Sequence, residues 1–393
     1  MDKTEERLAT IVERLVSFPT VASNPRDITS CIDWVRARVL MHSPRLDVRT
    51  FTSHEKPSVL FTAGKVPPRV LFCGHLDVVE AQRQHFRASA IDETHMQGRG
   101  TADMKGPIAA LIDIMATEPL SGVGLLLTTD EEIGGEDGTN HVLQQVGWRP
   151  EVVVLPDGGA NMRLVTEQKG LLRLGLVAKG VAAHASRPWL GDNPIDHIYD
   201  AYKSLLQAYP VPVAEDDWRV SIAMTGIHAG VAPNSVPWHA EATLDIRYPA
   251  SPLMPVSTLF ADIQRHLGRY KVAAHIISQG EGFQLDALSP FVQRLQEVSQ
   301  VVRQEPLPLM REAGASDARF FAAEHVPVLM FQPECAGWHG DDEWIDMQSL
   351  ATFRALCIGF ARSLLGRDRA PVCTRMAPRK VAHPPMLKRE VAS

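Results

Sequence analysis

Three short apolar runs stand out in the first half of the chain, at residues 70–72, 122–128 and 152–155. Between the first two, residues 106–115 carry apolar side chains at the spacing of one helix face. Each run is long enough for a buried strand and is followed by glycines and polar groups. Strands that alternate with helices favour an α/β fold with a central, mostly parallel sheet and flanking helices.

From residue 170 the pattern changes. Residues 172–177 and 242–248 alternate between apolar and polar side chains, which is typical of half-exposed strands, while residues 193–209 and 256–267 have helical periodicity. We therefore expect a smaller α+β domain inserted into the first. The expected divisions are 1–169 and 283–366 for the larger domain, 170–282 for the inserted domain, and 367–393 for a disordered basic tail. A partner-binding role for the tail stays open.

Composition narrows the function classes. The chain has 393 residues, a formal net charge of −6 and 45% hydrophobic residues, which is typical of a globular protein and does not favour nucleic-acid binding. No apolar run approaches the roughly 20 residues that span a bilayer. The five cysteines include no C-x-x-C pair, and the charged N-terminal segment does not resemble a secretory signal. These features predict a cytoplasmic protein.

Polar clusters follow the expected strands. His75 and Asp77 come directly after the first strand, and Asp103 precedes the helix at 106–115. A histidine beside a carboxylate is typical of a metal ligand with its orienting partner, although a hydrogen-bonded surface pair has the same pattern. Asp103 is equally compatible with an N-cap.

Three further clusters have the same placement. Glu131 and Glu132 follow the second strand, Asp157 follows the third, and His339 stands among glycines after an apolar segment at 328–331. Adjacent carboxylates repel one another unless a cation offsets them, whereas an acidic loop in solvent needs no cation. Because ligands in such folds gather at the carboxyl ends of strands, the five clusters together indicate one site.

These motifs resemble the M20-type metallohydrolases. Gly-His-Leu-Asp at 74–77, Gly-Arg-Gly-Thr-Ala-Asp-Met-Lys-Gly at 98–106, the Glu131–Glu132 pair and the late His339 occur in the family's order. The family's two-zinc amidohydrolases include succinyl-diaminopimelate desuccinylase, acetylornithine deacetylase, aminoacylases and some dipeptidases. The resemblance extends from about residue 5 to residue 365 and implies a zinc-peptidase-like larger domain, with the inserted domain serving for dimerisation and as a lid.

The resemblance also implies the metal ligands, which are His75, Asp103, Glu132, Asp157 and His339. Asp103 would bridge two Zn²⁺ ions. His75 and Asp157 would complete one site, and Glu132 and His339 the other. Nitrogen and oxygen donors of this kind suit Zn²⁺ and tolerate Co²⁺ or Mn²⁺.

Two more residues are assigned from the same motifs. Asp77 would orient His75, and Glu131 would act as general base and acid on a water that the ions activate. We expect the Glu131 and Glu132 side chains to point in opposite directions, as successive side chains do in an extended segment.

The inserted domain is expected to complete the site. By resemblance, His184 would reach the partner subunit's active site and stabilise the oxyanion, while Asn234 and Arg247 would bind the substrate carboxylate. Gly314 would also bind the substrate, as part of a turn that lies beside the site in the family. A structural histidine at a turn and a strand-face salt bridge are the alternatives for His184 and Arg247.

The resulting expectation is a homodimeric deacylase that cleaves the amide bond of a small N-acyl amino acid. Asp157 stands where desuccinylases and deacetylases have Glu, and Arg187 where desuccinylases have Tyr. Asp157 favours the alternative of a dipeptidase or aminopeptidase, which would act on a dipeptide or other peptide. A non-catalytic binding relative is a third hypothesis. The chain lacks H-E-x-x-H, G-x-S-x-G and P-loop motifs.

Overall fold

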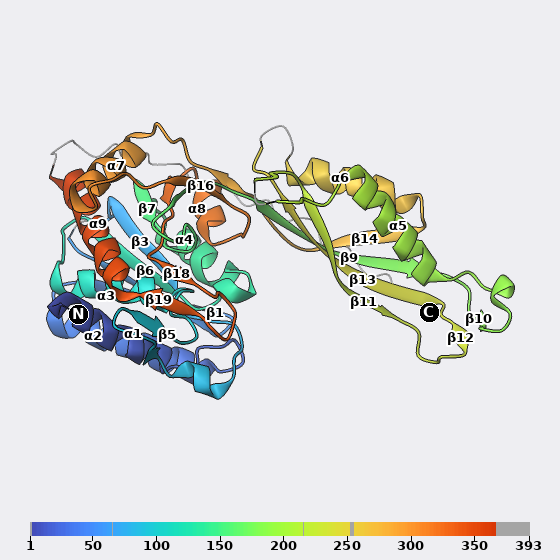
Figure 1. The fold of residues 1–393 in the computed structure, drawn as a ribbon, viewed down its shortest axis with the longest axis horizontal. Coiled ribbons are helices and arrows are strands. Elements are labelled where there is room, and N and C mark those ends of the chain that lie inside the picture. Colours follow the sequence, from blue (N-terminus) through green and yellow to red (C-terminus); the bar gives the residue numbers. More distant parts are fainter. Residues whose placement is uncertain (1, 65, 215, 252–254, 367–393) are drawn as a thin grey trace, which may run out of the picture.

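The computed structural model describes residues 2–64, 66–214, 216–251 and 255–366, so the predicted tail lies outside the described residues. Two hydrophobic cores are present: one in the larger domain, and one within residues 172–272 of the smaller domain. In Figure 1 the smaller domain extends away from the larger one. The exact boundaries expected at residues 170 and 282 stay a prediction.

The central sheet of the larger domain has six strands. Their order is β1 (Asp47–Ser53), β2 (Lys56–Thr62), β6 (Val123–Thr128), β3 (Val70–His75), β7 (Val152–Val154) and β17 (Val328–Leu329). Strands β6, β3, β7 and β17 are parallel, whereas β2 is antiparallel to both β6 and β1. The expected α/β fold with a central sheet is confirmed.

The β1–β2 hairpin is the part of this sheet that the sequence did not predict. Its two turn residues, His54 and Glu55, both have positive φ angles, 40° and 64°. Two-residue hairpin turns need this conformation and usually obtain it with Asn-Gly or Asp-Gly. Since the chain lacks that signal here, the turn is not recognisable from its residue types.

Helices pack around α3 (Lys105–Thr117), of which all but the last residue are buried. Its neighbours include α1 (Lys3–Val16), α2 (Pro25–His42) and α9 (Met347–Leu365). Asp2 caps α1 and Asn24 caps α2, so both helices begin at side chains that accept backbone N–H groups. The larger domain also contains α4 (His141–Val146), α7 (Pro290–Val302) and α8 (Ala318–Ala323).

Two small sheets complete the larger domain. One has the order β15 (Phe283–Gln284), β8 (Leu164–Gln168) and β16 (Leu309–Glu312). The other has the order β18 (Cys335–Ala336), β19 (Trp344–Asp346), β5 (His95–Gln97) and β4 (Ser89–Ala90). The second sheet joins the chain on both sides of residue 339 to the segment before residue 103, which brings distant parts of the sequence together.

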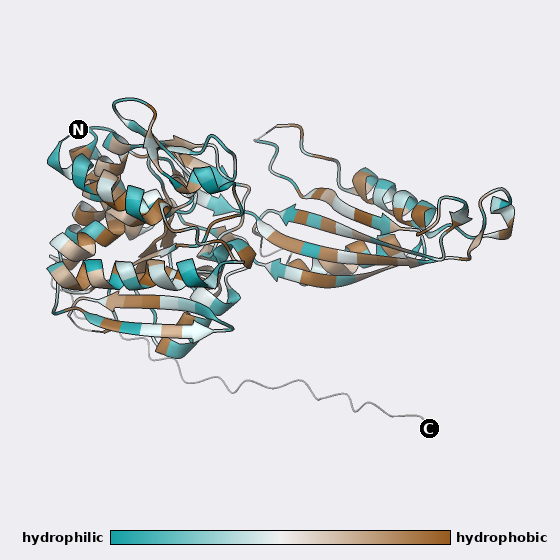
Figure 2. Ribbon diagram, turned by 90° about the horizontal axis from the view of Figure 1, so that it is seen from below, coloured by the Kyte–Doolittle hydropathy of each residue, from teal (hydrophilic) through white to brown (hydrophobic). Residues whose placement is uncertain are grey.

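The smaller domain is an antiparallel sheet covered by two helices. The sheet has the order β11 (Ser221–Ala229), β13 (His239–Tyr248), β9 (Gly170–Lys179) and β14 (Val272–Gly280). Alternate apolar residues of β9 are buried with side chains of α5 (Pro194–Ala208) and α6 (Val256–Gly268). Figure 2 shows the alternation as hydrophilic and hydrophobic bands along these strands. The strands β10 (Ala183–His184) and β12 (Ser235–Val236) pair at the far end of this domain.

A loop of the smaller domain contacts the larger one. Lys169 Nζ lies 4.8 Å and Arg311 Cζ 4.7 Å from the centroid of the Trp218 ring, and Arg311 also donates to the carbonyl of Asp216. Cation–π contacts of this kind stabilise by about 0.5–1 kcal/mol where solvent reaches them. The connection between the domains therefore includes side-chain contacts as well as the two chain crossings.

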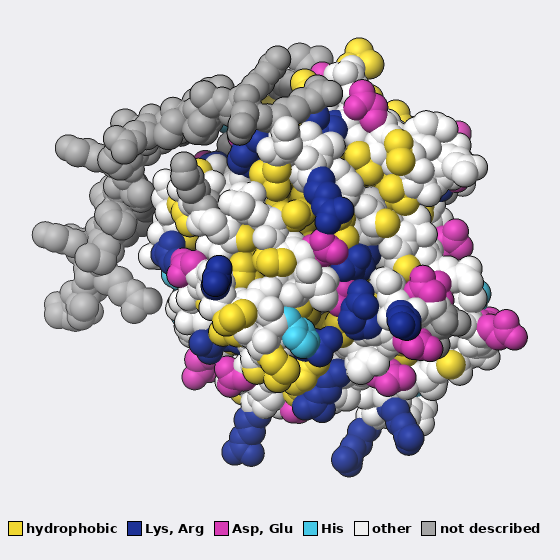
Figure 3. Space-filling view, turned by 90° about the vertical axis from the view of Figure 1, so that its left-hand side faces the viewer, with side chains coloured by type: hydrophobic (Ala, Val, Ile, Leu, Met, Phe, Trp, Pro, Cys, Tyr) yellow, Lys and Arg dark blue, Asp and Glu magenta, His cyan; other side chains and the backbone are white. Residues whose placement is uncertain are grey.

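At the end of the larger domain away from the smaller one, basic and acidic side chains are interspersed among hydrophobic ones (Figure 3). Cys31, Cys73, Cys335 and Cys357 are free and buried. Within the described residues, no helix combines the length and apolar character needed to cross a bilayer.

Candidate metal centre

The predicted ligands lie beyond the carboxyl ends of the parallel strands. Strand β3 ends at His75, β6 leads to Glu132, and β7 leads to Asp157. His339 follows β18, and Asp103 lies in the loop before α3. Parallel strands end at the same edge of a sheet, so residues far apart in the sequence meet there.

The distances define two groups that share one carboxylate. His75 Nε2 lies 3.1 Å from Asp103 Oδ1, and His339 Nε2 lies 3.2 Å from Asp103 Oδ2. Ligand atoms of His75, Asp103 and Asp157 lie within 4.8 Å of one another, as do those of Asp103, Glu132 and His339. The structure thus brings together all five residues that the sequence singled out as ligands.

Two of the alternatives left open by the sequence are wrong. Asp103 does not cap α3, because the N-cap residue of this helix is Met104, whose side chain makes no cap hydrogen bond. The carboxylate of Asp103 instead accepts hydrogen bonds from the imidazoles of His75 and His339. His75 and Asp77 are not a surface pair, because they are only 1% and 2% exposed.

Asp77 joins two of the ligand-bearing segments. Its backbone carbonyl lies 3.0 Å from His75 Nδ1, closer than its carboxylate at 3.6 Å. The carboxylate Oδ2 instead accepts the backbone N–H of Glu132 at 3.0 Å. The ring of His75 is therefore oriented mainly through the main chain, while the Asp77 carboxylate positions the glutamate segment.

The residues present fit a pair of cations. Glu132 Oε1 and Asp157 Oδ2 are buried without a hydrogen-bond partner. Burial and the charge of Asp103 raise the pKa of Asp157 well above its usual value. Hydrogen bonds that His339 donates to the carboxylates of Asp103 and Glu132 raise the pKa of His339 to about 10. Buried carboxylates without partners are destabilising unless a cation compensates them, and ions at these groups would do so.

Glu131 lies beside the ligands and belongs to neither group. Burial and the charge of Asp157 raise the pKa of its carboxyl well above the usual value. Residues Glu131–Ile133 form a 3₁₀ turn, so the extended conformation expected for the glutamate pair is wrong. The backbone N–H groups of Ile133 and Gly135 donate to the Asp130 carbonyl and close this turn.

His184 and Asn234 come together at the tip of the smaller domain. His184 pairs with Ser235 between β10 and β12, and the Asn234 carbonyl accepts the N–H of Ala185. Both side chains are exposed. Figure 1 places β10 and β12 at the end of the molecule remote from β3, so within one chain the structure does not bring them to the ligands.

The other two predicted substrate contacts have different surroundings. Arg247 is half-buried on β13, and its Nε and Nη2 donate to the carboxylate of Asp245 at 2.7 and 3.3 Å. Gly314 is exposed between β16 and α8, in the larger domain. The strand-face salt bridge considered for Arg247 is therefore present.

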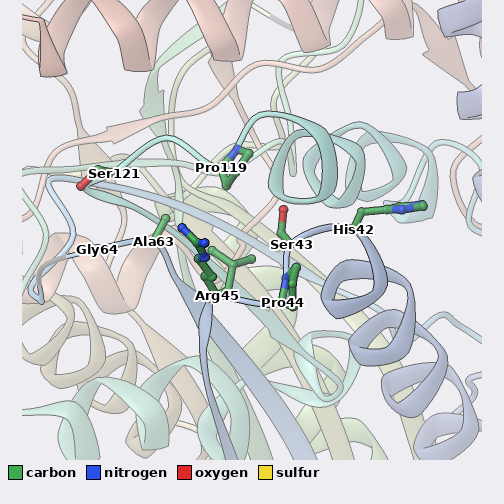
Figure 4. Close-up of a pocket in the computed structure, with 9 residues that line it drawn as sticks. His42, Ser43, Pro44, Arg45, Ala63, Gly64, Pro119 and Ser121 are labelled. Atoms are coloured by element: carbon green, nitrogen blue, oxygen red, sulfur yellow. The ribbon is translucent and has the colours of Figure 1, made fainter.

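Two surface hollows lie away from the ligands. One, of about 340 Å³, is lined by Leu46, Ala63 and Ser121 among others, at the amino ends of β1 and β6 and the carboxyl end of β2 (Figure 4). It lies at the opposite end of the central sheet from the candidate centre. The other, of about 400 Å³, is lined by Trp238, Ser235 and neighbouring residues at the tip of the smaller domain.

Sequence reasoning missed the buried polar groups that support the ligands. Arg99 and Glu343 form an ion pair beneath the Asp103 loop, with side chains only 3% and 2% exposed. Asp130 and Asp317 are also buried, and burial raises their pKa values to about 7 and about 6. The one signal for Arg99 was its place between two glycines in a motif that is otherwise assigned to metal binding.

The comparisons with known proteins decide the family. Residues 71–362, well over half of the chain, match the family described as peptidase family M20/M25/M40. The chain belongs to this family. It is 30% identical over 329 residues to a succinyl-diaminopimelate desuccinylase of Acidiphilium cryptum, a match that covers 79% of this chain and 86% of the relative.

Solved structures of two peptidases share the fold. A tripeptidase from Staphylococcus aureus superposes with a TM-score of 0.76 at 17% identity, covering 92% of this chain and 99% of that one. A Bacillus subtilis protein described as a dinuclear metal-binding peptidase of the M20 family has a TM-score of 0.67 at 15% identity, covering 93% and 99%. As an M20 member, the chain is a metal-dependent hydrolase of amide bonds.

Proposed function

We propose that this M20 enzyme removes the acyl group from a small N-acyl amino acid, using two Zn²⁺ ions. The observation that carries the proposal is the pair of three-residue groups that share Asp103. Each carboxylate oxygen of Asp103 has a separate imidazole beside it, so each oxygen would share an ion with that imidazole. Co²⁺ or Mn²⁺ would substitute, because all the donors are nitrogen or oxygen.

Each group of side chains would bind one ion. His75, Asp103 and Asp157 would hold the first ion, and Asp103, Glu132 and His339 would hold the second. When bound, two such ions lower the pKa of a water toward neutrality and polarise the scissile carbonyl.

Glu131 is placed to move the proton. Its side chain belongs to neither ligand group, and burial favours the protonated form. With cations bound beside it the group would start as a carboxylate, which would accept a proton from the attacking water and then return it to the leaving amine. The amide bond breaks as the amine departs, so the net reaction adds one water across that bond.

The smaller domain would serve the active site of a second subunit. His184 Nδ1 accepts the backbone N–H of Ser186 at 3.1 Å, so in the neutral imidazole the proton lies on Nε2. That tautomer presents a hydrogen-bond donor, as stabilisation of an oxyanion requires. His184 and Asn234 are exposed and lie far from the candidate metal ligands of the same chain. We therefore propose a homodimer in which both side chains enter the active site of the partner subunit.

Substrate binding would draw on more than one element. Asp245 already occupies the Nε–Nη2 edge of the Arg247 guanidinium, so a substrate carboxylate would meet the hydrogens that remain on Nη1 and Nη2. We propose Asn234 as the second contact to that carboxylate and the Gly314 turn as part of the pocket wall.

The free cysteines support a reducing, cytoplasmic location.

A dipeptidase activity is the second candidate, because Asp157 is the residue usual in that branch. The two activities differ in the charge next to the scissile bond: a deacylase accepts a blocked amine, whereas an aminopeptidase requires a free one. We expect one purified preparation to hydrolyse N-acetyl or N-succinyl amino acids at a higher kcat/KM than dipeptides with free amines. The reverse order, measured by release of free amine, would identify a dipeptidase.

Metal removal tests the class of mechanism. Dialysis against a chelator should abolish turnover of either substrate type, since both would depend on the same ions. Adding back Zn²⁺ should restore activity in proportion to occupancy, up to two ions per chain. Full activity of a preparation shown by elemental analysis to be free of metal would contradict the proposal.

A further inference from the structure

One buried carboxylate holds the loop that carries the shared ligand. Glu343 Oε1 accepts the backbone N–H groups of Ala102 and Asp103 at 2.9 and 3.0 Å. Its Oε2 accepts the N–H of Gly100 at 2.9 Å and Arg99 Nη1 at 2.7 Å. A single side chain thus satisfies three main-chain donors in the four residues that end at Asp103.

The partner of this carboxylate reaches the second ligand segment. Arg99 places Nη2 3.1 Å from the backbone carbonyl of His339 while Nη1 contacts Glu343. The backbone N–H of Gly98 also donates to the Glu343 carbonyl at 3.0 Å. The planar fork therefore joins the Asp103 loop to the His339 loop across 240 positions of sequence.

From these contacts we propose that Arg99 and Glu343 are positioning residues that fix the spacing between Asp103 and His339. They thereby set the affinity for the ion on the Glu132–His339 side. The inference rests on the proposed metal centre and adds the residues that organise it. His75 and Asp157 lie on other segments, and His75 is oriented independently by Asp77. Because Asp103 is shared, both ions should lose affinity, but the ion beside His339 should lose more, since Arg99 also contacts the His339 loop.

Glu343→Gln tests the carboxylate with little change of shape. An amide has one acceptor oxygen and one NH₂ group, so one of the two donor pairs would face another donor. The variant would then lose either the hydrogen bonds to the backbone of Ala102 and Asp103 or those to Gly100 and Arg99. Arg99→Lys tests the planar guanidinium. A lysine ammonium keeps the positive charge but cannot reach both the Glu343 carboxylate and the His339 carbonyl in one plane.

The experiment is a titration of metal-free full-length protein with Zn²⁺. Binding is measured by calorimetry and by competition with a chromophoric chelator. Wild type should bind two ions. In Glu343→Gln and in Arg99→Lys, the ratio of the second dissociation constant to the first should rise by about 10–100-fold, the usual effect of losing a residue that orients a ligand. The Zn²⁺ concentration for half-maximal activity should rise in parallel.

Asp113→Asn is the matched control. Asp113 is a fully buried carboxylate on α3 that accepts from Arg7 and Arg354, so the substitution removes the same charge from a similar ion pair. It contacts no ligand segment, so thermal stability should fall while both dissociation constants stay at the wild-type values.

The outcomes separate the two proposals. A wild type that binds fewer than two ions contradicts the metal centre itself. A wild type that binds two, with an unchanged ratio in Arg99→Lys, overturns the positioning role alone. If Glu343→Gln does not fold, Arg99→Lys decides. An equal loss of affinity in Asp113→Asn would also overturn the inference, since general destabilisation would then explain it.

Discussion

Replacing Glu131 with Gln should lower kcat by about 10²–10⁴-fold, the usual contribution of a general acid–base group. The amide cannot accept the proton of the attacking water or return it to the leaving amine. Because Glu131 belongs to neither ligand group, both ions should remain bound. Elemental analysis and steady-state kinetics on the same preparation measure the two effects together.

Glu136→Gln is the control for this substitution. Glu136 lies five positions further along the chain, at the start of a π-helical turn (Glu136–Asn140), where its exposed carboxylate accepts from Asn140. That variant should keep wild-type kcat and metal content. If Glu131→Gln loses an ion along with activity, its effect belongs to metal binding, and the assignment as general base is wrong.

The second large effect is expected at the tip of the smaller domain. His184→Ala should lower kcat by about 10²–10³-fold, as the loss of one oxyanion donor does elsewhere. Folding and metal content should not change, because the side chain is exposed and its contacts are confined to Ser186. Kinetics and a thermal melt of the same sample separate the effect on catalysis from that on stability.

Mixing two inactive variants tests whether His184 acts across subunits. A dimer of one His184→Ala chain and one Glu131→Gln chain contains one complete site and one that lacks both groups. Random reassembly should restore about a quarter of wild-type activity, because half of the dimers are mixed and each has one complete site of two. No recovery in verified mixed dimers would place His184 outside the partner's site.

The ligands could be predicted from the sequence because each lies in a short polar motif beside a predicted strand or helix. The segments containing His75, Asp103 and Glu132 carry their own signals, and the parallel sheet brings them together. The supporting pair could not be predicted in this way. Glu343 and Arg99 are joined only because a small sheet pairs β19 with β5, and their residue types alone indicate a surface ion pair.

Local conformation was predicted less well than the placement of the site. The turn at His54 and Glu55 has no glycine, and the 3₁₀ turn at Glu131 depends on hydrogen bonds to the Asp130 carbonyl. The contact of Arg247 could not be predicted from the sequence either. Side-chain packing on β13 decides whether its guanidinium binds Asp245 or a substrate. Such choices involve small energy differences that residue types do not reveal.

The central claim is that Asp103 is shared by two ions. Anomalous diffraction from crystals of the Zn²⁺-loaded protein, recorded above and below the zinc edge, tests it most directly. We predict two peaks, both beside Asp103, one with His75 and Asp157 and the other with Glu132 and His339. A single peak at full zinc loading, or two peaks that do not share Asp103, would contradict the account.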